Sequence, residues 1–156
     1  MKKFIALSAN KYKLKKGIVP VSLSWRTKTI EGWCAKVKMT KKDIIIGHSI
    51  GGAVALIVAA KTPPKELHLY APTPIFSEFL HFFKKAAGPE LLDRIKEVKP
   101  IPTISCPVFI YIGDDEHPLM IANVKSISEH IPQAVYKLVK GADHMTIISE
   151  YLDKTS

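Results

Sequence analysis

The chain of 156 residues has only two cysteines and no hydrophobic run long enough to cross a membrane. Cys34 and Cys106 lie far apart and form neither a ligand pair nor a disulfide framework, which favours a reducing compartment and disfavours a metal site. The longest apolar stretch, residues 53–60, is far below the ~20 residues of a membrane-spanning helix. The apolar run after the basic first residues is too short for a signal peptide. We therefore expect a cytoplasmic protein with no membrane partner.

Acidic residues are scarce in the first part of the chain. Residues 1–42 hold twelve Lys and Arg against one acid, Glu31, whereas residues 43–156 hold eleven against thirteen acids. The formal net charge of +9 therefore belongs to one end of the sequence. The Lys-rich segment 11–16 could touch acidic partners, but no nucleic-acid-binding motif accompanies it. We expect a solvated face and no nucleic-acid binding.

The hydrophobic pattern predicts one α/β domain over residues 1–156. With 47% hydrophobic residues, a chain of this length can bury a full core. Apolar runs that predict strands alternate with patterns of helical period, which indicates parallel strands joined by right-handed crossovers, with helices on both faces of the sheet. The predicted strands are 4–7, 18–23, 43–46, 66–70, 107–112 and 135–139. The predicted helices are 30–37, 53–60, 76–83, 91–98, 120–131 and 144–152.

A possible nucleophile lies where the third strand meets an Ala-rich helix. Residues 47–51, Gly-His-Ser-Ile-Gly, match the pattern G-x-S-x-G, in which a strand turns sharply into a helix with the serine at the apex. The pattern alone is weak, because composition would produce it by chance in roughly one chain in twenty. Its position between an all-Ile strand and an apolar helix is the context that the motif requires. Ser49 is therefore the candidate nucleophile.

A serine nucleophile needs a base, and the base needs a group that holds its tautomer. The turn after the fifth predicted strand offers Asp114, Asp115 and Glu116, and the turn after the sixth offers His144. His117 is a weak competitor for the base, because it lies beside the acids in the wrong turn. The chain order serine, acid, histidine is the one found in α/β-hydrolases. We treat His48, His68, His81 and His130 as structural or solvated.

On these motifs the chain resembles the α/β-hydrolase family over nearly its whole length. It is similar to a minimal serine hydrolase or esterase that lacks the first two antiparallel strands and begins with the strand feeding the oxyanion loop. The resemblance implies a doubly wound, mostly parallel sheet of about six strands, with residues 72–105 as a small helical cap. It assigns Ser49 as nucleophile, His144 as general base and Glu116 as the acid, with Asp114 and Asp115 left as rivals. Glu116 stands where the family more commonly has Asp.

The resemblance also implies an oxyanion hole made of two backbone N–H groups. Ile50, which follows the nucleophile, supplies the first. Aligning Ser8-Ala9-Asn10 with the family's His-Gly-x selects Asn10 for the second, with Ala9 as the alternative. Ala9 would then adopt a turn usually left to glycine.

The expected function is hydrolysis of small carboxylic esters through an acyl-enzyme, with no cofactor and no metal. The alternative is a binding or regulatory domain on the same fold with a weak or inactive site. The helical face formed by Phe76, Phe79, Leu80 and Phe83 in the predicted cap is ordinary core or the wall of the substrate site. Substrate identity, the choice among ester, thioester, amide and acyl transfer, and the oligomeric state stay open.

Overall fold

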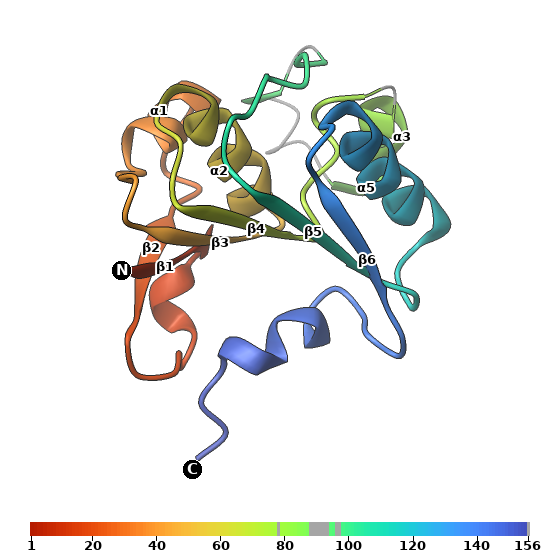
Figure 1. Ribbon diagram of the computed structural model, residues 1–156. Helices are drawn as coiled ribbons and strands as arrows, with labels where there is room; N and C mark the ends of the chain where they lie inside the picture. The colour runs from red at the N-terminus through yellow and green to blue at the C-terminus, as the bar shows by residue number, and fades with distance from the viewer. Residues whose placement is uncertain (78, 88–93, 96–97, 156) are drawn as a thin grey trace.

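The computed structural model describes residues 1–77, 79–87, 94–95 and 98–155. These residues form a three-layer α/β structure around one six-stranded sheet (Figure 1). Every strand pair in the sheet is parallel. The strand order is β2-β1-β3-β4-β5-β6. The strands are β1 (Lys2–Leu7), β2 (Ile18–Leu23), β3 (Ile44–His48), β4 (Glu66–Tyr70), β5 (Val108–Gly113) and β6 (Val135–Val139).

The sheet confirms the predicted fold class and all six predicted strands. The chain reverses direction across the sheet after β2, so that β3 lies on the opposite side of β1 from β2. Such a switch point is where doubly wound sheets place their sites, at the carboxyl ends of the strands. Ser49 follows β3 directly and therefore lies at this point.

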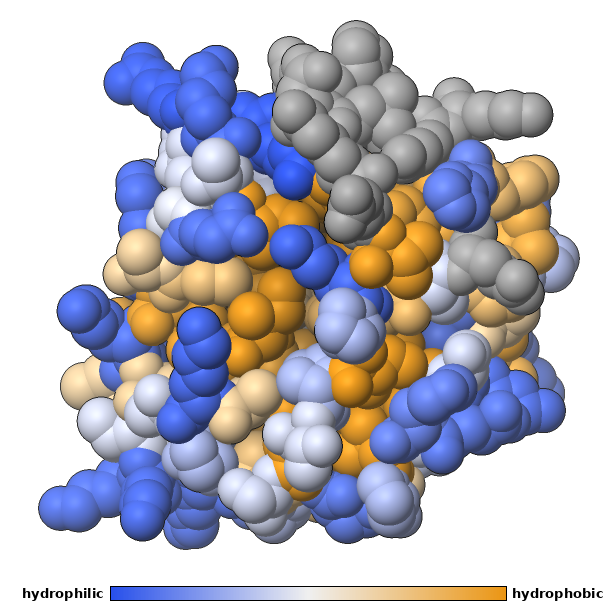
Figure 2. Space-filling view, turned by 90° about the horizontal axis from the view of Figure 1, so that it is seen from above, coloured by the Kyte–Doolittle hydropathy of each residue, from blue (hydrophilic) through white to orange (hydrophobic). Residues whose placement is uncertain are grey.

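The helices divide between the two faces of the sheet unequally. Among the described residues, the α-helices that lie on one face are α1 (Ile30–Ala35), α2 (Ile50–Lys61), α3 (Phe79–Ala87) and α5 (Pro118–His130) (Figure 1). The opposite face carries two 3₁₀ helices, η1 (Ala9–Lys11) and η2 (Thr146–Tyr151). Figure 2 looks onto the α-helical face and shows hydrophobic residues gathered in its middle, between hydrophilic residues at the rim.

The alternation of the strands gives each face its own core. Ile5, Ile45 and Leu67 point into the larger core under α2, α1 and α5. Their neighbours Phe4 and Ile46 point the other way, into a smaller core with residues of η1 and η2. Each central strand is therefore buried on both sides, as its unbroken apolar sequence predicts.

Local sequence explains how the helices beside the site begin and end. The hydroxyl of Thr29 accepts a hydrogen bond from the backbone N–H of Gly32 at 2.9 Å and so caps α1. Helix α2 starts at Ile50, three residues before the predicted start, and ends at Lys61, shortly before a Pro-Pro pair. Its two glycines lower intrinsic helix propensity, but they are buried against the sheet.

Two predicted elements need correction or lie outside the described residues. The predicted helix 144–152 is instead the 3₁₀ helix η2, because Asp143 and Thr146 use their side chains to close a tight turn at its start. The predicted helix 91–98 has Leu91 and Leu92 outside the described residues. In the part of the chain that the structure describes, no helix is long and apolar enough to span a bilayer.

Candidate active site

The turn from β3 into α2 holds Ser49 in a strained conformation. Its φ is 55° and its ψ is −120°, a region that residues other than glycine rarely adopt. The two motif glycines allow this turn. A Cβ on Gly51 would lie 1.9 Å from the carbonyl oxygen of Ile5, and one on Gly47 would lie 2.7 Å from the Cα of Gly52. The close approach of α2 to β1 therefore requires the small residues that the motif predicts.

The turns after β5 and β6 are fastened to each other. A Cβ on Gly113 would lie 1.9 Å from the carbonyl oxygen of Ala142, so the two turns touch through their backbones. The N–H of Asp115 donates to the same carbonyl at 3.1 Å. The carboxylate of Asp114 accepts from the N–H of Gly141 at 2.8 Å. These contacts fix the spacing between the acidic turn and the histidine turn.

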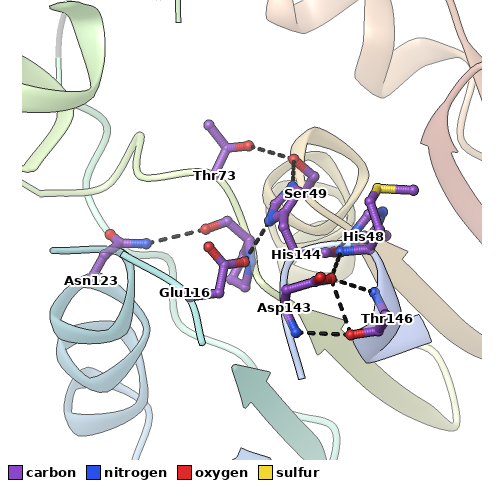
Figure 3. Close-up of polar contacts among 10 residues, drawn as sticks. His48, Ser49, Thr73, Glu116, Asn123, Asp143, His144 and Thr146 are labelled. Carbon is purple, nitrogen blue, oxygen red and sulfur yellow. Dashed lines mark hydrogen bonds and ion pairs between the residues drawn. The ribbon is translucent and has the colours of Figure 1, made fainter. Parts of the chain in front are cut away.

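Ser49, His144 and Glu116 form a hydrogen-bonded row (Figure 3). The Oγ of Ser49 lies 3.1 Å from Nε2 of His144, and Nδ1 of His144 lies 2.6 Å from Oε1 of Glu116. Because a carboxylate only accepts, Nδ1 carries the proton and Nε2 is free to accept from the serine. The Glu116 side chain is 8% exposed and that of His144 is 39% exposed, so the acid is sheltered while the base faces the solvent side.

Among the three rival acids, only Glu116 contacts His144 in the described structure. The carboxylate of Asp114 accepts a hydrogen bond from the backbone N–H of Gly141, and Asp115 is exposed. His117 caps the start of α5 by accepting from the N–H of Leu119 at 3.2 Å. The structure therefore brings together the three residues that the sequence ranked first.

The turn that carries His144 is held by its preceding residue. The carboxylate of Asp143 accepts hydrogen bonds from the backbones of Met145 and Thr146 and from the Thr146 hydroxyl, at 2.8–3.0 Å (Figure 3). These bonds to the backbone of Thr146 and Met145 lower the pKa of Asp143 below its ordinary value. Asp143 was not predicted from the sequence to have a role, although an Asp two or three residues before a helical turn is a known capping signal.

His48 is buried against the other side of the same turn. The residue is 3% exposed, and its Nε2 lies 2.7 Å from the backbone carbonyl oxygen of His144. The carbonyl can only accept, so Nε2 of His48 carries the proton. Burial lowers the pKa of His48 to about 4, which leaves the ring neutral near pH 7. The sequence placed His48 among structural or solvated histidines, and the structure makes it a buried partner of His144.

Thr73 contacts Ser49 from another side than His144 does (Figure 3). Its Oγ1 lies 3.4 Å from Oγ of Ser49, and its N–H donates to the Ser49 carbonyl at 3.1 Å. With the serine proton directed at His144, the threonine hydroxyl is the donor of this pair. The buried side chain of Asn123 in α5 holds the adjacent loop through the carbonyl of Pro72, at 3.1 Å. The sequence analysis assigned neither residue a role.

A cavity of about 160 Å³ lies beside Ser49 and is lined by Ile50, by Tyr12 after η1, and by residues of β1 and the His144 turn. Ile50 begins α2, and the first N–H groups of a helix have no partner within it. Asn10 is not among the residues that line the cavity, and its side chain accepts from Ser22. Its assignment as an N–H donor stays a prediction.

The turn after β1 differs from the expected one. Ser8, not Ala9, has the left-handed backbone, with φ at 50°, whereas Ala9 begins η1 and is fully buried. The glycine-like position of this turn is therefore one residue earlier than the sequence alignment implied. Ser8 can adopt it because its N–H donates to Leu23, which anchors the turn on β2.

The predicted aromatic face of the cap divides between two environments. Phe76 and Leu80 are 5% and 1% exposed and belong to the main core. Phe79 and Phe83 line a cavity of about 220 Å³ together with residues of α5. Phe83 also packs against the main core, so the structure confirms a core role for Phe76 and Leu80, and a substrate wall at Phe79 and Phe83 stays a prediction.

No family model and no curated protein matches this sequence. Solved structures do match. The chain aligns with Rv0554 from Mycobacterium tuberculosis at a TM-score of 0.69 and 11% identity, over 96% of this chain and 84% of the other. With Est1E from Butyrivibrio proteoclasticus the TM-score is 0.69 at 12% identity, over 96% and 82% of the two chains. With MGS-MChE2, an alpha/beta hydrolase enzyme from a sediment metagenome of the Mar Chica lagoon, the TM-score is 0.67 at 13% identity, over 95% and 83%.

This chain has the α/β-hydrolase fold. Identities this low establish the architecture and leave the chemistry to the residues themselves. Within the α/β-hydrolase fold, the row of Ser49, His144 and Glu116 lies at the carboxyl ends of β3, β6 and β5, at one edge of the sheet. The fold explains why three residues far apart in sequence meet there.

Proposed function

We propose that the protein is a serine hydrolase that cleaves small carboxylic esters through an acyl-enzyme intermediate. The observation that carries the proposal is the hydrogen-bonded row from Ser49 through His144 to Glu116, in the tautomer that nucleophilic attack requires. The strained turn at Ser49 and the position of Ile50 as the first residue of α2 support the same proposal.

In the first half of the reaction, Oγ of Ser49 attacks the ester carbonyl carbon while its proton passes to Nε2 of His144. Glu116 stabilises the imidazolium that forms. The N–H of Ile50 and one from the turn after β1, at Asn10 or Ala9, stabilise the oxyanion. The carbon–oxygen bond to the alcohol then breaks as His144 gives the proton to the leaving oxygen.

In the second half, water replaces the alcohol. His144 takes a proton from the water, whose oxygen attacks the acyl carbon. Collapse of the tetrahedral intermediate returns the proton to Oγ of Ser49 and releases the carboxylic acid. No group other than the side chains and backbone N–H groups named above is needed for these steps.

Labelling with a fluorophosphonate probe tests the nucleophile. The wild-type protein should be labelled at Ser49, and Ser49→Ala should not be labelled. Equal labelling of both proteins, or no labelling of the wild type, contradicts the proposal. Esters, thioesters and amides of the same acyl group, assayed with both proteins, identify the bond that is cleaved.

A matched pair of variants tests the acid. Glu116→Gln keeps the size of the side chain but removes the charge that stabilises the imidazolium, so kcat should fall by about 10²-fold or more. Asp115→Asn changes an exposed carboxylate one residue away and should leave kcat within about twofold. A large loss in Asp115→Asn with an active Glu116→Gln would reassign the acid.

A further inference from the structure

An aromatic cavity lies beside the candidate active site, between α3 and the start of α5. It measures about 220 Å³, and its lining is almost entirely apolar. Phe79, Phe82 and Phe83 supply one wall, and His117 and Met120 supply the other. The rings of Phe82 and His117 lie 5.7 Å apart at their centroids, so the two walls meet at the mouth.

The backbone connects this cavity to the reacting groups at two points. Pro74, which lines the cavity, follows Thr73, whose hydroxyl lies 3.4 Å from Oγ of Ser49. His117 follows Glu116, which contacts His144 at 2.6 Å. The cavity therefore flanks the hydrogen-bonded row on the Thr73 side, while the smaller cavity that holds Ile50, His144 and Met145 lies at Ser49 itself.

We propose that this cavity binds the acyl part of the substrate, and that the acyl group is aromatic or a medium-length alkyl chain. The inference rests on the proposed function. At the tetrahedral carbon, the oxyanion faces the N–H of Ile50 and the leaving oxygen faces Nε2 of His144. We place the acyl chain in the remaining direction, on the side of Thr73, whose neighbour Pro74 lines the aromatic cavity.

The size of the cavity favours a ring over an acetyl group. A dry protein cavity of about 150 Å³ is enough to bind benzene. A volume of about 220 Å³ therefore accepts a phenyl ring with a short linker, whereas an acetyl group would leave most of it empty. Aromatic walls also favour a ring, because offset and edge-on ring pairs gain energy beyond the area they bury.

The exposure of Phe82 supports the same assignment. Phe82 is 53% exposed although it lines the cavity, so a bound group can still contact its ring. A phenyl or alkyl group in the cavity would cover part of this surface and gain about 25 cal/mol for each Å² of apolar area removed from water. Because Phe82 contributes little to the core, it can be replaced without unfolding the protein.

Ester hydrolysis provides the first test. For the wild type, kcat/KM for 4-nitrophenyl phenylacetate should exceed that for 4-nitrophenyl acetate by about tenfold or more. Phe82→Ala should remove most of that preference, because it should lower kcat/KM for the phenylacetate ester much more than for the acetate ester. Leu138→Ala, which truncates an equally exposed apolar residue on β6, should leave the preference unchanged. A wild type without the preference, or a Phe82→Ala variant that loses activity equally on both esters, overturns the inference.

Binding of the product separates this inference from the proposed function. Phenylacetate should bind Ser49→Ala, as measured by calorimetry, and the Kd should rise about tenfold when Phe82→Ala is added. If phenylacetate fails to bind, or binds both variants equally, the cavity assignment is wrong whatever the labelling shows. If phenylacetate binds as expected but fluorophosphonate does not label Ser49, only the proposed hydrolysis is wrong.

A second inference rests on different contacts, those of His48. We infer that His48 is a positioning residue for His144. His48 directly precedes Ser49 in the chain, and its Nε2–H donates to the His144 backbone carbonyl at 2.7 Å. The two rings lie 5.0 Å apart. One buried side chain therefore links the turn of the nucleophile to the turn of the base.

Two variants of His48 separate positioning from general stability. His48→Leu keeps the bulk and removes the donor, whereas His48→Gln keeps an N–H at a similar reach. His48→Leu should lower kcat about tenfold or more with KM unchanged, and His48→Gln should recover most of the loss. Equal loss in the two variants, or a folded His48→Leu protein with wild-type kcat, overturns this role. If His48→Leu does not fold, an inactive but folded His48→Gln protein overturns it as well.

Discussion

The two faces of the sheet are covered by different kinds of structure, and they contribute differently to stability and to the candidate site. Under the α-helices, the core is apolar and contains side chains such as Leu56, Leu67 and Ile110 that are fully buried. On the opposite face, short 3₁₀ segments and aromatic rings cover the strands, and polar groups reach into the layer. The first face supplies most of the hydrophobic stabilisation, and the second carries the turn with His144.

The thinner face is held by specific contacts rather than by helix packing. Tyr70 stacks on Tyr111 with ring centroids 4.3 Å apart. The Tyr70 hydroxyl forms a hydrogen bond with the Tyr151 hydroxyl and another, at 3.0 Å, with the carboxylate of Glu150. Burial raises the pKa of Tyr70, so its hydroxyl stays protonated and able to donate. A face built this way can hold one turn accurately without a long helix.

The Lys-rich segment also belongs to this thinner face. The N–H of Lys15 donates to the carbonyl of Tyr151 at 2.9 Å, and the N–H of Asp153 donates to that of Lys13 at 2.8 Å. Leu14 is partly buried against the smaller core. The backbone of residues 13–15 therefore ties the end of the chain to the sheet, while the lysine side chains face outward.

Truncating one buried side chain on each face gives the largest predicted contrast. Leu56→Ala should lower the free energy of unfolding by about 4 kcal/mol, because α2 is fixed between the sheet and α1 and cannot close the cavity. Ile148→Ala should cost about 2 kcal/mol, since η2 is short and can move inward. Urea denaturation measures both. Equal losses would show that the two faces are equally rigid.

The close contact of α2 with β1 predicts the next largest effect. Gly51→Ala places a methyl group 1.9 Å from the Ile5 carbonyl oxygen, so the helix must shift, at a cost of about 3 kcal/mol. Gly17→Ala is the control, because its Cβ would meet nothing within 4 Å and only its positive φ is unfavourable. That substitution should cost about 1 kcal/mol. Similar thermal stabilities for the two variants would contradict the packing argument.

The buried histidine of the thinner face predicts a pH dependence. The pKa of His48 in the folded protein is about 4, below its ordinary value of 6.5, so the unfolded chain binds the proton first as pH falls. Stability is then full above about pH 6.5 and is lost toward pH 4, by up to about 3 kcal/mol. His144 and Glu116 are the charged or titratable groups that act on His48.

His48→Gln provides the comparison for this pH dependence. The glutamine does not titrate, so the variant should lose less stability than the wild type between pH 7 and pH 4. Carboxylates with lowered pKa, such as Asp143, contribute equally to both proteins and cancel in the difference. Parallel stability curves for the two proteins would contradict the assignment of a neutral, buried His48.

The smallest predicted effect concerns the tyrosine contacts. Tyr151→Phe removes one hydroxyl, but Tyr70 keeps Glu150 as a partner, so the free energy of unfolding should fall by about 1 kcal/mol or less. Tyr70→Phe leaves two partners without their contact and should cost more. The reverse order would show that Tyr151, not Tyr70, is the centre of this group.

Sequence alone determined the elements and the order of the chemistry. Six apolar strands, the small residues around Ser49 and the chain order of serine, acid and histidine are local patterns, and local patterns predict local structure. They predicted both the sheet and the three residues that meet in the site. They also predicted that glycine must flank Ser49, because a sharp turn into a packed helix leaves no room for a Cβ.

Only the tertiary structure decided which carboxylate forms a hydrogen bond with His144 and which contacts fix the turn that contains His144. Asp114 is excluded because it binds Gly141, and Glu116 is selected because its longer side chain reaches Nδ1. His48 and Thr73 gained their contacts in the same way, from segments brought together by folding. Ser49 and His144 are 95 positions apart, and no periodicity within a segment reports a contact at that separation. Such contacts depend on side-chain reach and backbone register, which are set when the turns pack together.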